Sequence, residues 1–329
     1  MNILATIYDN RKQIVYDVSQ VIGNLQISSY IEDQPTKCTF DLVKADNISF
    51  HEGATFSLTV DGKGVFKGYV FSKKRNRDVE IIHVTCYDQL RYLKNKDSYV
   101  FENLTSDQIF ARICEDFVLK YKVVDRSSYI CAPRTHDSKP LYDMIKTALY
   151  DTLINAKTWF IIRDNFGTLE HVSITSLDSG IILGDESGIE NLEYETSIDE
   201  DVYNQIKLYR DNNKTGKREI FIVNDTIYGG NNLKRWGILQ YYAKVDDNLN
   251  LAQIEQRARG MLALYDDTKR TLKLECLGSF KVFAGSFITV RIADLGDLSV
   301  NQYMLVTSCT HKINNNEHRM SVTAEMVTL

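Results

Sequence analysis

The stretch TFDLVKADNISFHEG, residues 39–53, has a counterpart near the other end of the chain. Residues 271–285 read TLKLECLGSFKVFAG, with the same distance from Thr to Gly and nearly the same placement of apolar residues. The alignment continues without a gap through three alternating apolar positions, where Phe56, Leu58 and Val60 match Ile288, Val290 and Ile292. Alternation with a period of two is typical of a strand with one buried face. The stretch therefore predicts β-strands, and its recurrence predicts two related β-units.

The repeat extends into the hairpins that follow. Residues 70–72 match residues 306–308 after a loop that is longer in the second copy, and residues 84–85 match residues 322–323 after a polar tip. Any two antiparallel strands alternate with the same period, so matching apolar positions alone are weak evidence. The shared spacing, the ungapped run through two strands and the shared order of hairpins favour an internal duplication. We expect each copy to close a small barrel or a curled sheet.

The chain around this repeat predicts a mainly β fold with an α+β insert. Residues 1–102 are rich in β-branched and aromatic residues, and Asp61-Gly62 is typical of a tight hairpin turn, so we expect a first β-domain here. Residues 103–185 predict an α+β accessory domain of two helices and a strand–turn–strand. Thr105 or Ser106 is expected to cap the first helix, and Pro140 stands where the second can begin.

Strand-like sequence returns after residue 185. We expect residues 186–210 and 251–329 to form the second β-domain, interrupted by a β-rich insert at residues 211–250. A helix is predicted over residues 250–265 of this second domain, because Asn250 is a good N-cap and apolar residues follow at helical spacing. The fold class predicted is thus two related, antiparallel, β-barrel-like domains with accessory domains packed against them.

Composition narrows the possible functions. The chain of 329 residues carries a formal net charge of −5, which argues against duplex nucleic acid as a main ligand. The six cysteines form no CxxC pair and are interpreted as small hydrophobic residues of a reducing cytoplasm. The N-terminus has no apolar core typical of a signal peptide, and no run approaches the roughly 18 apolar residues of a membrane span. We expect synthesis and folding in the cytoplasm, with any release occurring by lysis.

Four ordered segments resemble the baseplate hub proteins of contractile phage tails. They are YDQLRYLKNKDSYVF at residues 87–101, YNQIKLYRDNNKTGKRE at 203–219, KRWGILQYY at 234–242 and LVTSCTHKINNNEHRMSV at 305–322. The likeness is greatest to the hubs of defective prophages and of phage-tail-like bacteriocins from Gram-positive bacteria. The N-terminal part of type VI secretion spike proteins is also similar. The resemblance covers essentially the whole chain.

The resemblance implies a structural assembly protein. Hubs of this family are homotrimers in which each chain gives two tube domains to a pseudo-hexameric ring around a channel. The ring adapts the six-fold tail tube to the three-fold spike, so the implied partners are the tail tube protein, the spike and other baseplate proteins. Nucleic acid is expected at most in transient passage through the channel. Some relatives carry a lysozyme or a spike in the same chain; because this sequence ends just after its last predicted strand, we expect those parts to be separate proteins.

No catalytic, cofactor or metal site is expected, although two rival functions stay open. A baseplate-borne peptidoglycan hydrolase would need two carboxyls facing one cleft. The acidic groups at residues 115–116, 185–186 and 199–201 are instead interpreted as solvated. A carbohydrate-binding tail protein would need clustered aromatic residues, yet the chain has only Trp159 and Trp236.

Two further groups of side chains stand out. His311 and His318 flank a polar hairpin tip and could approach each other across its strands, although a metal would need two more ligands. Lys73, Lys74, Arg75 and Arg77 form the most concentrated charge of the chain. They are interpreted either as a solvated hairpin tip that discourages edge pairing, or as a contact with an acidic partner or with nucleic acid in a channel. The net negative charge favours a protein over nucleic acid as the partner.

Overall fold

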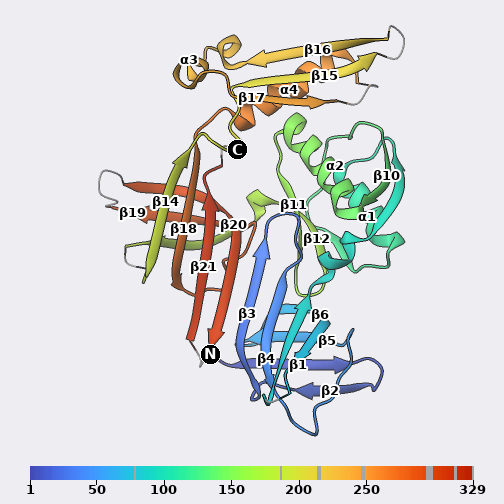
Figure 1. Cartoon of the computed structure of the whole chain (residues 1–329), viewed down its shortest axis with the longest axis vertical. Helices are drawn as coiled ribbons and strands as arrows, with labels where there is room; N and C mark the ends of the chain where they lie inside the picture. Colours follow the sequence, from blue (N-terminus) through green and yellow to red (C-terminus); the bar gives the residue numbers. More distant parts are fainter. Residues whose placement is uncertain are drawn as a thin grey trace.

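The computed structural model describes residues 1–77, 79–185, 187–212, 216–245, 249–293, 299–314 and 317–327 (Figure 1). Within these residues one large sheet of 13 strands forms the body, and three smaller sheets lie with the helices at one side and one end. Nearly all strand pairs are antiparallel. The predicted fold class, mainly antiparallel β with an α+β part, is confirmed. None of the described helices has the length and hydropathy that a membrane span requires.

The first β-unit supplies one half of the large sheet. Its strands are β1 (Ile3–Asp9), β2 (Ile14–Asp17), β3 (Ile22–Tyr30), β4 (Lys37–Val43), β5 (Thr55–Val60), β6 (Lys63–Arg75) and β7 (Ile81–Tyr87). They follow the spatial order β3-β4-β7-β6-β5-β1-β2. Phe40 and Phe56 stack at 4.5 Å between ring centroids in its core. Asp61 and Gly62, both at positive φ, make the predicted tight turn between β5 and β6.

The second β-unit repeats this order. Its strands are β13 (Asp178–Gly184), β14 (Asn191–Ser197), β18 (Lys269–Leu277), β19 (Phe287–Ile292), β20 (Val300–Asn314) and β21 (Glu317–Glu325). Their order β14-β18-β21-β20-β19-β13 corresponds strand for strand to β3-β4-β7-β6-β5-β1. One difference concerns the last strand, because β13 runs parallel to β19 whereas β1 runs antiparallel to β5.

The two units also share an irregularity at the aligned position. The β6–β7 and β20–β21 pairs each shift register immediately after Val70 and Val306, respectively. The N–H of Gly53 donates to the Val70 carbonyl at 2.8 Å, and that of Gly285 donates to the Val306 carbonyl at 2.8 Å. Both glycines have positive φ, at 85° and 95°. A shared bulge closed by a glycine at the same place is stronger support for duplication than matching apolar residues.

The first aligned strand differs from the ungapped alignment by two residues. Cys38 lies opposite Cys86, whereas Ala324, the counterpart of Cys86, lies opposite Leu272 rather than Arg270. A shift of two residues keeps every side chain on its own face of the sheet, so the sequence pattern could not detect it. The strands β5 and β19 and the two glycines keep the predicted alignment.

The α+β part lies beside the first unit, at the right in Figure 1. It contains η1 (Gln89–Lys94), β8 (Lys96–Phe101), α1 (Ser106–Asp116), β9 (Tyr121–Val123), β10 (Arg134–Pro140), α2 (Leu141–Ala156), β11 (Phe160–Asp164), β12 (Leu169–Ser173) and η2 (Ile174–Ser176). Thr105 caps α1 through a capping box, and α2 begins directly after Pro140, as predicted. Leu93 and Phe101 pack in the core of this part, while β13 pairs with the second unit. We therefore propose domain boundaries near residues 88 and 177 in place of 102 and 185.

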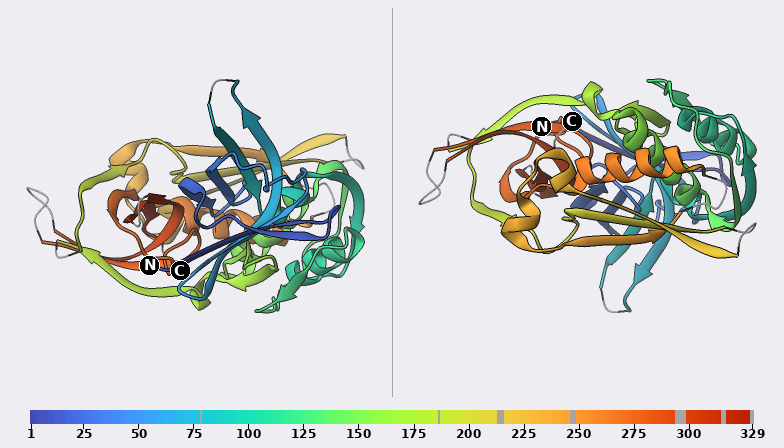
Figure 2. Two further views of the ribbon diagram at one scale, coloured as in Figure 1. Left: turned by 90° about the horizontal axis from the view of Figure 1, so that it is seen from below. Right: turned by 90° about the horizontal axis from the view of Figure 1, so that it is seen from above.

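The insert forms a separate layer at the top of Figure 1. It comprises β15 (Gln205–Asn212), β16 (Lys217–Asn224), η3 (Asp225–Tyr228), α3 (Asn232–Trp236), β17 (Gln240–Lys244) and α4 (Leu251–Tyr265). We therefore propose bounds near residues 205 and 265 for the insert, in place of 211 and 250. Asn250 caps α4 as predicted. The assignment of this helix to the second β-domain was wrong, because its apolar face, including Ile254 and Met261, packs on Ile206 and Leu208 of the β15 strand. Figure 2 shows α4 lying along this sheet.

All six cysteines are free and buried. Each of the three largest cores holds two of them: Cys38 and Cys86 in the first β-unit, Cys114 and Cys131 in the α+β part, and Cys276 and Cys309 in the second β-unit. Burial raises the pKa of the Cys276 thiol to about 11, which keeps it protonated at neutral pH.

Candidate assembly surface

The two β-units meet edge to edge inside one chain. Strand β3 pairs with β20 in antiparallel register, from Tyr30 opposite Ser308 to Leu25 opposite Ile313. Figure 1 shows these strands, blue and red, side by side at the centre of the sheet. Pairing satisfies backbone groups that an open sheet edge would leave available to other chains. The junction therefore turns two sheets into one continuous surface.

Neutral polar groups hold this internal junction. The hydroxyl of Thr310 donates to that of Ser28 across the two strands at 3.0 Å. The N–H of Ile31 donates to the Thr307 carbonyl at 2.9 Å, extending the ladder by one bond. Sequence patterns missed this contact, because small polar residues on a strand carry no signal of their partner.

Two histidines pack behind the same junction. His311 Nδ1 lies 3.0 Å from His318 Nε2, so the predicted approach across the hairpin is confirmed. His311 Nε2 lies 2.9 Å from the Val282 carbonyl, an arrangement that suits a neutral ring with its proton on Nε2. Burial, with His318 as a second cause, lowers the pKa of His311 to about 4. Among the described residues, no group of three His, Cys, Asp or Glu side chains could hold a metal ion.

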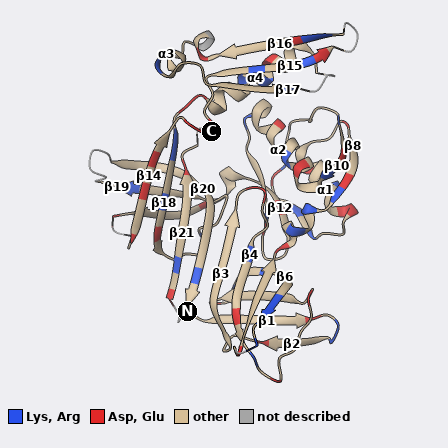
Figure 3. Ribbon diagram, in the orientation of Figure 1, with Lys and Arg blue, Asp and Glu red and all other residues tan. Residues whose placement is uncertain are grey.

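The basic residues of the predicted hairpin tip do not act together. Strand β6 continues to Arg75 and pairs with β7 as far as that residue. The interpretation of the basic residues as a hairpin tip was therefore wrong for Lys73, Lys74 and Arg75, and of the four only Arg77 lies beyond the strand. Lys73 is largely buried, donates to the Phe50 carbonyl at 2.5 Å and forms an ion pair with Glu52 at 3.3 Å. Lys74 lies on the opposite face of β6, and Lys74, Arg75 and Arg77 are exposed. Figure 3 marks the positive charge on β6.

The acidic groups weighed as catalytic have local partners. Glu115 accepts a hydrogen bond from the Tyr121 hydroxyl at 2.5 Å, and Asp116 accepts one from that of Tyr99 at 2.8 Å. Asp185 accepts from the Ala293 N–H at 2.8 Å, while residue 186 lies outside the described residues. In the third group, Asp201 is exposed and lies 3.9 Å from the Lys269 ammonium. These contacts fit stabilising roles better than a shared catalytic cleft.

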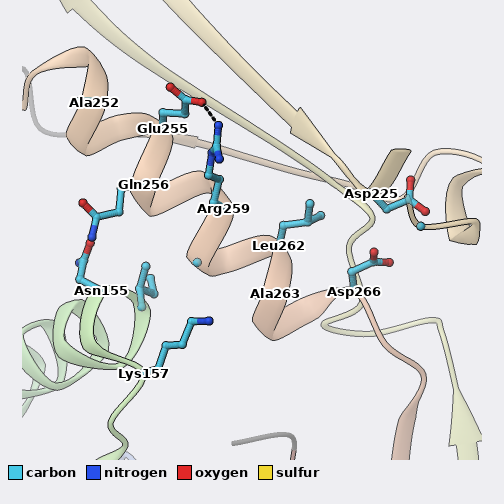
Figure 4. A pocket seen from close by; sticks show the side chains of 13 residues that line it. Asn155, Lys157, Asp225, Ala252, Glu255, Gln256, Arg259, Leu262, Ala263 and Asp266 are labelled. Carbon is cyan, nitrogen blue, oxygen red and sulfur yellow. Dashed lines mark hydrogen bonds and ion pairs between the residues drawn. The ribbon is translucent and has the colours of Figure 1, made fainter. Parts of the chain in front are cut away.

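A hollow of about 720 Å³ lies between α2 and α4 (Figure 4). The two helices approach closely at its wall because α4 has a glycine, Gly260, where a Cβ would lie 2.5 Å from the Ile154 carbonyl oxygen. Asp225 and Asp266 lie near each other at one end of the hollow. Burial is the main cause that raises the pKa of Asp266, with a smaller effect from Asp225. Asp225 accepts the Leu233 N–H at 3.0 Å, which anchors the adjoining loop.

The insert presents an exposed sheet face. Side chains of β15–β17 that point away from α4 include Tyr209 and Tyr242, whose rings stack at 5.0 Å between centroids. The Arg218 guanidinium lies 4.2 Å from the centroid of Tyr209. Ile220 and Ile222 on the same face are about half exposed, at 51% and 49%. Aromatic and arginine side chains beside apolar ones are the usual composition of a protein contact. Trp159 lies between α2 and β11 and Trp236 ends α3, so neither belongs to the strands of this face.

The chain belongs to the YqbQ-like family, whose model matches residues 25–325. It is 30% identical over 278 residues to the uncharacterized protein YqbQ of Bacillus subtilis strain 168, covering 83% of this chain and 81% of that protein. It is 28% identical over 283 residues to the phage-like element PBSX protein XkdQ of the same strain, covering 83% and 82%.

Solved structures share the whole fold at low sequence identity. The 43 kDa tail protein of prophage MuSo2 from Shewanella oneidensis matches with a TM-score of 0.73 at 13% identity, covering 98% of both chains. A type VI secretion component of Escherichia coli, described as structurally similar to T4 bacteriophage tail proteins, matches with a TM-score of 0.59 at 11% identity, covering 94% of this chain and 74% of that one. The chain therefore has the fold of phage tail proteins, as the sequence resemblance implied.

Proposed function

We propose that the chain is the structural hub of a contractile tail baseplate, in a phage or in a phage-tail-like bacteriocin. The observation that carries the proposal is the repeated strand order of the two β-units, joined edge to edge through β3 and β20. One chain then supplies two neighbouring positions of a ring. Three chains give six similar positions while keeping three-fold symmetry, which is the geometry that a six-fold tube and a three-fold spike require of an adaptor.

The proposed mechanism is geometric and involves no chemical step. The two β-units, acting as tube domains, carry the ring and contact the tail tube protein on one side and the spike on the other. The exposed face of the insert sheet, with Tyr209, Tyr242 and Arg218, contacts another baseplate protein. Assembly takes place in the bacterial cytoplasm, and lysis releases the finished phage or bacteriocin particle with the protein in its baseplate. Nucleic acid is at most in transit through the channel.

The oligomeric state tests this proposal. Mass photometry of the purified chain is expected to show a particle of three chains, and negative-stain images are expected to show a ring with six similar lobes around a channel. Sedimentation velocity extends the measurement to hundreds of micromolar. A chain that stays monomeric over this whole range would contradict the ring.

The peptidoglycan hydrolase remains a second candidate because of one feature, the neighbouring carboxyls Asp225 and Asp266 in the hollow beside α4. The hydrolase predicts release of soluble muropeptides from purified cell walls by the chain. It also predicts loss of that release in Asp225→Asn and Asp266→Asn, with Glu102→Gln, an exposed carboxyl elsewhere, as the control. The hub predicts no release by any of them.

A further inference from the structure

Several strand edges of the large sheet stay open among the described residues; β2 and β13 each have one partner strand, and two further open edges lie on β14 and on the end of β6. In the described part of the chain, β14 is the last strand on its side and pairs only with β18. Strand β6 pairs with β5 as far as Tyr69, and beyond Val70 its outer edge has no strand beside it among the described residues. Figure 2 shows the β6–β7 hairpin projecting from the body of the molecule. Open edges of this length are sites for pairing with another chain.

The internal duplication relates these two open edges to the two edges that are already paired. Strand β6 is the counterpart of β20, and β14 is the counterpart of β3. Since β20 pairs with β3 inside the chain, the same geometry would bring β6 of one chain to β14 of a second copy. Such a contact is head-to-tail and generates a closed ring when the rotation fits, three internal junctions alternating with three between chains.

We propose that the outer edge of β6 in one chain pairs antiparallel with β14 of the next chain, with Lys74 opposite Glu195. The inference rests on the proposed ring and adds the strands, the register and the charges that close it. The partner is a second copy of this chain, because the edge that fits β6 is built from the same sequence.

The register follows from the ladders on either side of each strand. The β6–β7 and β20–β21 pairs have equivalent registers after their bulges, which places Lys74 at the position of Thr310. Strand β3 pairs with β4, and its counterpart β14 pairs with β18. Strands β4 and β18 are aligned with each other through their other partners, β7 and β21. This alignment places Glu195 at the position of Ser28. Thr310 and Ser28 are the pair that hydrogen-bonds across the internal junction. Lys74 and Glu195 would occupy that same pair of positions between chains.

Charge complementarity supports this partner. The β6 edge carries Lys74 and Arg75, with Arg77 just beyond it, and all three are exposed; β14 carries Glu193 and Glu195, also exposed (Figure 3). Glu193 already forms an ion pair with Lys273 at 3.3 Å. Among the described residues, Lys74 and Glu195 have no side-chain hydrogen bond or ion pair. Opposite charges directly facing each other across two strands stabilise the pair, and like charges destabilise it.

Site-specific cross-linking tests the register. The variant Lys74→Cys/Glu195→Cys is expected to give covalent trimers on a non-reducing gel after mild oxidation, because directly opposed Cβ atoms lie about 4.5–5.5 Å apart. The native cysteines are buried and do not compete. The matched control Lys74→Cys/Thr196→Cys moves one thiol by a single residue to the other face of β14 and is expected to stay uncross-linked.

Charge reversal tests the same junction without cysteines. Lys74→Glu and Glu195→Lys alone are each expected to raise the concentration at half-assembly by up to about fivefold per junction, and the double variant is expected to restore it. The control variant Lys63→Glu/Glu102→Lys reverses two exposed charges outside the junction.

The outcomes separate this inference from the proposed function. A wild-type trimer with cross-linking of the matched pair and rescue by the double reversal supports both. A wild-type trimer in which the pair does not cross-link, or in which the single reversals assemble as well as the wild type, overturns the junction and leaves the hub proposal standing. Stronger assembly of Lys74→Glu alone would mean that the cations repel edge pairing, and it would also overturn the junction. A wild-type chain that is monomeric throughout overturns both.

Discussion

The internal β3–β20 edge and the open β6 and β14 edges occupy equivalent places in two copies of one β-unit, yet their side chains differ in kind. The internal edge has the hydroxyls of Ser28 and Thr310 and a buried neutral His311. At the positions equivalent to Thr310 and His311, the open β6 edge has Lys74 and Arg75. The backbone groups of an edge that pairs within its own chain are covered as soon as the chain folds. An edge that pairs only with another chain is exposed to water until assembly, and charged side chains on it prevent non-specific pairing. The duplicated unit therefore kept its backbone geometry and changed its edge chemistry.

Acidification is expected to have the largest effect on stability, and this effect comes from His311 in the second β-unit. An unfolded histidine binds a proton near pH 6.5, whereas His311 stays neutral down to its lowered pKa of about 4. Between these values the unfolded chain binds more protons, so the free energy of unfolding falls as the pH falls, by about 3 kcal/mol from this residue. Burial also lowers the pKa of His318, which acts in the same direction.

The measurement is denaturant unfolding of wild type and His311→Gln at a series of pH values from 7.5 to about 4. The variant is expected to lose less stability on acidification than wild type. Arg75→Gln, at the equivalent position of the first unit, serves as the control and should follow the wild-type pH profile. Parallel profiles for wild type and His311→Gln would rule out the neutral buried histidine.

The aligned glycines allow a second comparison of the two β-units, through the stability that each unit loses when the glycine is replaced by alanine. Gly53→Ala is expected to cost about 1 kcal/mol of stability, because its φ of 85° strains an L residue. Gly285→Ala is expected to cost more, since its Cβ would also lie 2.2 Å from Ile161 Cδ1 of the α+β part, while nothing lies within 4 Å of a Cβ at Gly53. Chemical denaturation of both variants gives the two values. Equal losses would indicate that Ile161 moves aside at no cost.

The smallest effect concerns the hydroxyl pair of the internal junction. Thr310→Val removes the hydroxyl that donates to Ser28 and leaves the Gln26 amide its acceptor on Ser28; it is expected to lower stability by about 1 kcal/mol or less, as for an ordinary neutral hydrogen bond. Ser57→Ala, on β5 away from the junction, is the control. A loss of several kcal/mol would mean that the junction depends on this single bond and not on its ladder.

Local signals in the sequence predicted much of the fold. The capping residues Thr105 and Asn250, the start of α2 after Pro140 and the Asp61-Gly62 turn are visible because each fixes a backbone conformation by itself. The partner of an amphipathic face is not a local property, which is why α4 was assigned to the wrong sheet. The same limit hid the pairing of β3 with β20 and the two-residue shift of β18, since alternation marks a face and not a neighbour.

The buried cysteines make the local opening of each core measurable by thiol alkylation. All six thiols are buried, so a reagent reaches them only after protein motion exposes them. Burial also raises the pKa of Cys131 and Cys276 to about 11 and of Cys114 to about 12, which disfavours the reactive thiolate. The three largest cores each hold two of them. Timed alkylation followed by peptide mass mapping would therefore report how often each core opens, and in what sequence. Applied before and after ring assembly, the same reagent would show whether closing the ring slows the local opening of both β-units or of only one.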